Sequence, residues 1–84
     1  MKELDELQEI ARIATRKALE DYEFPETWQD SLVLGVFFED NARIFELYIP
    51  RERPEEAIVI SSARVNCQTK AVSVTISNLE KKIN

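Results

Sequence analysis

Histidine, cysteine and glycine, on which much enzyme chemistry depends, are missing or nearly missing from this sequence. Its 84 residues include no histidine, one cysteine (Cys67) and one glycine (Gly35). The absence of histidine excludes catalytic triads built on that residue and removes the usual general base and the commonest metal ligand. A single glycine excludes glycine-rich phosphate loops and the dinucleotide-binding fingerprint. We therefore expect no enzymatic activity and no bound cofactor.

The single cysteine also bears on the cellular compartment. It cannot form an intramolecular disulfide, and a structural zinc site would need three or four cysteine or histidine ligands. Secreted domains of this size usually rely on disulfides, and the residues that follow Met1 do not form a signal-peptide pattern. No apolar run approaches the ~20 residues that span a bilayer. These features predict a soluble, cytoplasmic protein that binds no metal and does not enter a membrane.

Negative charge is concentrated in the middle of the chain. The net charge is −5. Residues 1–17 carry four acidic and four basic side chains, residues 18–42 carry seven acidic and no basic ones, and residues 43–84 carry five acidic and seven basic ones. Nucleic acids and anionic membranes are poor partners for the central segment, whereas a basic protein surface would be attracted to it. The distribution favours a basic protein partner over nucleic acid or membrane.

Residues 3–22 are predicted to form an amphipathic helix that ends before Pro25, since the residue before a proline is disfavoured in a helix. Apolar side chains recur at intervals of three and four residues and form one broad face. The residues of this face are Leu4, Leu7, Ile10, Ala11, Ala14, Ala18 and Tyr22. Its three alanines would let the helix approach a sheet closely. Ile13 and Leu19 lie off this face and are expected to be exposed.

Four later segments are predicted to be β-strands: residues 31–38, 43–49, 57–65 and 71–77. The first is apolar at both alternating sets of positions, which is typical of a strand that is covered on both faces. The last alternates between apolar and polar residues, which indicates that one face contacts solvent. Turn-forming residues join the first two strands closely, so these strands should form an antiparallel hairpin.

One helix followed by four strands predicts a two-layer α+β fold, in which the N-terminal helix packs across a four-stranded antiparallel meander sheet. We expect residues 1–84 to form a single domain. The meander order places strand 31–38 at an edge, where its two apolar faces need cover. Either the helix and the connector around Trp28 wrap this edge, or the strand pairs with its counterpart in a second copy. A homodimer could also use the sheet face away from the helix, which would carry Val33, Phe37, Ile44 and Tyr48.

The last two strands are predicted to pair through Asn66 and Ala71 around a four-residue loop. This register brings the apolar residues together on one face, since Val65 then lies opposite Val72. Residues 63–72 are similar to the hairpins of PepSY-like domains, in which a short polar turn containing threonine joins two strands. Lys70 stands where such turns usually have glycine. The resemblance implies a hairpin and no function.

The candidate partner-binding residues lie in the acidic segment. Trp28 is the only tryptophan and is surrounded in sequence by carboxylates. It is either a lid over one end of the core or an aromatic anchor of an interface, and residues of this type are enriched in interface hot spots. The full set of candidates is Glu23, Glu26, Trp28, Asp30, Glu39 and Asp40.

Two classes of function are compatible with these features. The first is a small acidic interaction module without catalytic activity, for instance an inhibitor or immunity-type partner that binds a basic protein surface. The second is a small-ligand-binding domain or minor enzyme subunit with a pocket between helix and sheet, near Trp28 and Tyr48. Glu46 is interpreted as a charge that discourages aggregation. Cys67 is interpreted as incidental, because no base accompanies it.

Overall fold

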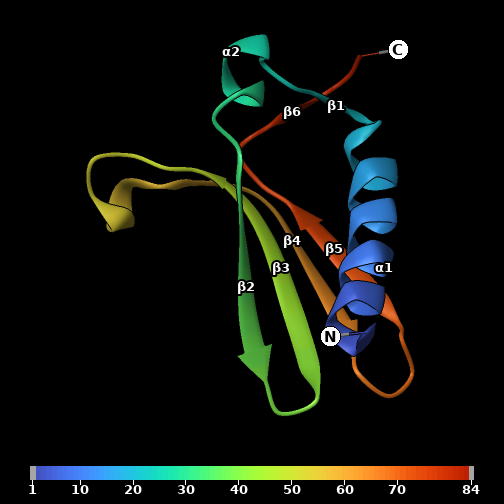
Figure 1. The fold of residues 1–84 in the computed structure, drawn as a ribbon. Helices are drawn as coiled ribbons and strands as arrows, with labels where there is room; N and C mark the ends of the chain where they lie inside the picture. The colour runs from blue at the N-terminus through green and yellow to red at the C-terminus, as the bar shows by residue number, and fades with distance from the viewer. Residues whose placement is uncertain (1, 84) are drawn as a thin grey trace.

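The computed structural model describes residues 2–83 and has the predicted two-layer α+β architecture (Figure 1). A long helix, α1 (Lys2–Leu19), packs on one face of an antiparallel sheet with the strand order β2-β3-β4-β5. The bounds of these strands differ from the expected ones by at most two residues. The strands are β2 (Val33–Glu39), β3 (Ala42–Ile49), β4 (Ile58–Asn66) and β5 (Val72–Ile76).

The core lies between α1 and the sheet face that it covers, which we call the inner face. Acidic residues occur in the first turn of α1 and basic residues in its last turn, which complements the helix dipole. The buried cluster consists of Leu7, Ala11, Phe45, Ala63 and Val65. Thr15, one turn beyond Ala11, is also buried, although it is polar and was not part of the predicted apolar face.

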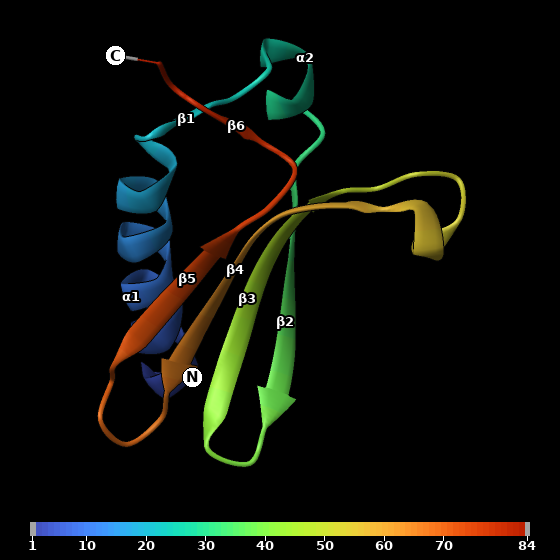
Figure 2. The same cartoon turned by 180° about the vertical axis from the view of Figure 1, so that it is seen from behind.

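The helix lies over β4 and β5 and not over the middle of the sheet (Figures 1 and 2). Val72 and Val74 of β5, beneath the helix, pack against the core cluster. A helix with its side chains is about 10–12 Å wide and neighbouring strands are about 4.8 Å apart, so one helix covers about two strands. The helix therefore does not wrap the edge formed by β2, which was one of the two expectations for that strand.

The β4–β5 hairpin has the predicted register. The Asn66 N–H donates to the carbonyl oxygen of Ala71 at 2.9 Å, and Val65 and Val72 are paired. The side-chain Oδ1 of Asn66 also accepts the N–H groups of Gln68 and Thr69, at 2.8 and 2.9 Å. Lys70 has a φ of 65°, in the left-handed region that favours glycine. The turn thus has a left-handed residue at the position where PepSY-like hairpins usually have glycine, but here that residue is a lysine.

A second, smaller sheet joins the segment that follows α1 to the C-terminal segment. β1 (Tyr22–Glu23) pairs antiparallel with β6 (Glu80–Lys81), so α1 ends at Leu19 and not at the predicted Tyr22. Neither strand was predicted, because two residues are too few to show an alternating pattern. A short helix, α2 (Glu26–Gln29), and a 3-10 turn, η1 (Pro54–Glu56), lie in the connections.

Candidate interaction surface

β2 forms one edge of the four-stranded sheet, and four of its apolar side chains are exposed, two on each face. Val36 pairs with Phe45, which packs under α1, so the alternate residues Leu34 and Phe38 also belong to the inner face. Leu34 and Phe38 are 41% and 64% exposed, and Val33 and Phe37 of the outer face are 38% and 51% exposed. These are four of the six large apolar side chains that are exposed in the described chain.

The free edge of β2 lacks the features with which proteins usually protect an edge strand. β2 contains no proline, its only charged side chain is that of its last residue, Glu39, and its pairing with β3 runs without a register shift. An unprotected edge of this kind can accept a strand from another chain through backbone hydrogen bonds. β2 is therefore suited to association both through its edge and through its two faces.

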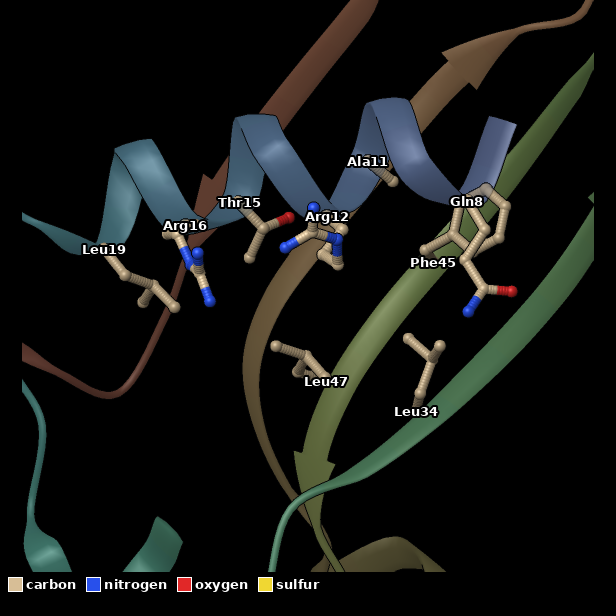
Figure 3. Close-up of a pocket in the computed structure, with 9 residues that line it drawn as sticks. All are labelled: Gln8, Ala11, Arg12, Thr15, Arg16, Leu19, Leu34, Phe45 and Leu47. Atoms are coloured by element: carbon tan, nitrogen blue, oxygen red, sulfur yellow. The ribbon is translucent and has the colours of Figure 1, made fainter. Parts of the chain in front are cut away.

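A groove of about 310 Å³ runs between α1 and the uncovered strands (Figure 3). Leu34 of β2 and Phe45 and Leu47 of β3 line it from the sheet. The lining residues of α1 are Gln8, Ala11, Arg12, Thr15, Arg16 and Leu19. Leu19, expected to be an ordinary exposed residue, is thus half-buried and helps to line the groove.

Basic groups border this groove although the protein as a whole is acidic. Arg12 pairs with Glu9, one turn earlier, through its Nε at 2.9 Å and through a second contact from Nη2. This side-chain hydrogen bonding to Arg12 lowers the pKa of the Glu9 carboxyl below its ordinary value of 4.5. Arg16 extends on the groove side of α1 (Figure 3) and has no ion pair among residues 2–83.

A third guanidinium, that of Arg43, lies on the inner face near the start of β3. It stands 4.6 Å from the centroid of the Phe38 ring and donates to the carbonyl oxygens of Glu39 and Ala42, each at 2.9 Å. Its cross-strand neighbour is Phe38, which confirms that it shares the inner face. The uncovered inner face is therefore apolar with arginines along its borders.

The six predicted binding residues do not form one patch, because β2 separates them into two groups. Four of them surround α2, at the end of the sheet where β2 begins (Figure 1). Trp28 packs edge-on against Phe24, with ring centroids 6.5 Å apart. Trp28 is half-buried and does not belong to the core cluster. This acidic group consists of Glu23, Glu26 and Asp30 with Trp28.

The other two candidates, Glu39 and Asp40, lie at the opposite end of β2, in and beside the turn to β3. A seven-residue strand is about 23 Å long, so this pair is remote from the α2 group. The Glu39 carboxylate is bonded to Arg64 of β4, which already neutralises its charge. The charge of Glu39 is thus engaged within the chain, whereas Asp40 is exposed.

Sequence reasoning missed the arginines of the groove and misplaced the pocket. Arg12 and Arg16 were not among the candidate binding residues. The available signal was the apolar residue Leu19 outside the predicted apolar face, which was expected to be exposed but is half-buried. Neither Trp28 nor Tyr48 lines the groove, so the predicted position of the pocket was wrong. Tyr48 pairs with Val33 and belongs to the outer face.

The remaining chemistry of the described chain is sparse. No group of three or more histidine, cysteine, aspartate or glutamate side chains within residues 2–83 is arranged to hold a metal ion. Across the same residues, no helix is both long enough and apolar enough to cross a membrane.

Comparison with protein families, curated proteins and solved structures gives no match for this chain. Its surfaces are the basis for an inference about function.

Proposed function

We propose that this protein is a non-catalytic interaction module that binds another protein through β2 and the groove beside it. The observation that supports this most directly is the concentration of exposed apolar residues in one unprotected edge strand. Isolated exposed apolar residues are normal on protein surfaces, but contiguous ones mark contact sites. Leu34 and Phe38 lie on one face of β2 and Val33 and Phe37 on the other, so the exposed apolar residues gather at one edge of the sheet and are not scattered singly.

The acidic group around α2 is proposed to attract a basic region of that partner. Charges at the rim of an interface mainly raise the rate of association and make it sensitive to salt. We expect Glu23→Lys, Glu26→Lys and Asp30→Lys to slow association. An association rate that does not change between about 50 and about 500 mM salt would contradict this steering role.

The test of the interaction surface is affinity capture from the native source with three forms of the protein. These are the wild type, a Leu34→Glu/Phe37→Glu variant, and an Ile13→Glu variant as the matched control. Ile13 is 56% exposed but lies on α1, away from β2. We expect a specific partner to be retained by the wild type and by Ile13→Glu and lost with the double variant. Equal capture by all three folded forms would refute the proposal.

The free edge also favours self-association, and we propose that the isolated protein forms a homodimer by antiparallel pairing of β2 with its counterpart. Such pairing is compatible with two-fold symmetry, since each copy offers the same strand. Light scattering at micromolar concentration should give the mass of a dimer. A monomer mass for the wild type would remove this part of the proposal.

The groove supports a second candidate function, the binding of a small apolar ligand. Its volume of about 310 Å³ lies at the lower end of the range of small-molecule sites, and its sheet side is apolar. An NMR titration with decanoate would test this, since its carboxylate could reach Arg16. The absence of shifts at Leu34, Leu47 and Arg16 at millimolar decanoate would argue against it.

A further inference from the structure

We infer that the groove between α1 and strands β2 and β3 receives an amphipathic helix of the partner protein, with carboxylates on the side of that helix that faces α1. This inference rests on the proposed function and specifies the form and charge of the partner. It concerns the inner face alone and leaves the edge of β2 available for strand pairing.

The first argument is the width of the vacant surface. α1 covers β4 and β5, and the inner face of β2 and the adjoining part of β3 remain open beside it. Two strands at about 4.8 Å spacing offer the width of one helix, and packed helices lie about 8–10 Å apart. Ala11 and Thr15, which line the groove from α1, are small enough to permit that approach.

The second argument is the apolar character of the floor. Leu34 and Leu47 are paired across the two strands, and both line the groove together with Phe45. Phe38 extends the apolar surface toward the other end of β2. A helix that presents apolar residues at intervals of three and four would cover these side chains along one stripe.

The third argument is the charge at the borders of this surface. Arg12 and Arg16 line the groove from α1, and Arg43 lies outside this lining, on the inner face near the start of β3. Glu9 forms an ion pair with Arg12, whereas Arg16 has none among residues 2–83, so the α1 border of the groove is positive within a protein of net charge −5. Carboxylates on the facing side of a bound helix would complement these arginines, whereas lysines there would be repelled.

A second copy of the described chain does not supply this helix. Among residues 2–83, α1 is the only helix longer than four residues, and its apolar residues Leu7 and Ala11 are already buried. The α2 helix has four residues and no buried side chain. The occupant is therefore expected to be a helix of a different protein.

The experiment uses two designed helical peptides of about 18 residues, a length at which an isolated helix can form. Both carry the same leucine stripe, but one is flanked by glutamates and the other by lysines. Calorimetry should show the glutamate peptide binding about tenfold more tightly. In NMR spectra, it should shift the signals of Leu34, Leu47 and Arg16.

Charge reversal in the protein provides the decisive control. Arg16→Glu should invert the preference, so that the lysine peptide binds more tightly than the glutamate peptide. Lys17→Glu makes the same change of charge one residue later, at a side chain that does not line the groove, and should leave the preference unchanged.

Three outcomes would overturn the inference: equal affinity for both peptides, binding that shifts only signals of the outer face, or no binding of either peptide. If a partner is still captured through β2 in any of these cases, the proposed function stands and the helix-in-groove inference fails. If capture is also independent of β2, both fail. A preference that Lys17→Glu inverts as well would likewise overturn the role of Arg16.

Discussion

The two halves of the sheet belong to one meander but differ in what lies over the inner face. Under α1, Ala63 and Val65 of β4 are completely buried. On the other side, Leu34 and Phe38 of β2 are exposed although they share the same face. The difference arises because one helix is wide enough for about two strands. The apolar character of a strand therefore does not determine whether it is covered.

The two edge strands show the same contrast in their sequences. β5 alternates between apolar residues that face α1 and exposed polar residues such as Ser73 and Thr75. It requires cover on one face, and α1 supplies it. β2 is apolar on both faces, and nothing within residues 2–83 covers its side chains fully. This contrast is the reason for assigning the interaction surface to β2.

The largest difference between the halves is expected from a matched pair of leucine substitutions. Leu7→Ala removes a completely buried side chain of the covered half and should lower the free energy of unfolding by about 2–5 kcal/mol. Leu34→Ala in the open half should lower it by less than about 1 kcal/mol, because much of that side chain is already in water. Urea denaturation measures both, and equal losses would contradict the contrast.

Substitutions in the two turns at the same end of the sheet should differ in their effect on stability by a smaller amount. Asn66→Ala in the β4–β5 turn removes the acceptor of two backbone N–H groups and should cost about 1 kcal/mol. Asp40→Ala in the β2–β3 turn should cost almost nothing, since no side-chain hydrogen bond of Asp40 occurs among the described residues. Thermal unfolding of both variants provides the comparison. A larger loss for Asp40→Ala would show that the open half is held by its turn.

The smallest effect is expected at Glu9, beside the groove. Its pKa is lowered chiefly by the side-chain hydrogen bond from Arg12 and only weakly by Arg16. A lowered pKa in the folded state stabilises the protein above pH 4.5, and this contribution is lost as the pH falls through the folded-state pKa. NMR titration should show the Glu9 pKa rising toward its ordinary value in Arg12→Ala. An equally large rise of the Glu9 pKa in Arg16→Ala would mean that Glu9 interacts with Arg16 as strongly as with Arg12.

The fold could be predicted from the sequence because its elements have clear periods. The alternation of Val72 and Val74 with polar residues fixed both the strand and its register with Val65. The position of α1 across the sheet could not be predicted, since helical periodicity identifies a buried face but not the strands beneath it. Burial of the polar Thr15 likewise depends on that position.

The candidate site was predicted less well than the fold. Acidic residues were selected because they are close in sequence, but β2 places Glu39 at one end of the sheet and Glu26 near the other. Glu39 then bonds to Arg64, 25 positions away in sequence, which no local pattern reveals. The apolarity of residues 31–38 on both faces was the more informative signal, because it identified β2 itself.

The central claim is that the open inner face of β2 and β3 seats a helix. Nuclear Overhauser effects between the leucine methyl groups of the glutamate-flanked peptide and this protein test that claim most directly. We predict contacts to the methyl groups of Leu34 and Leu47 and to the ring of Phe38. Contacts confined to Val33 and Phe37, on the outer face of the same strand, would contradict it.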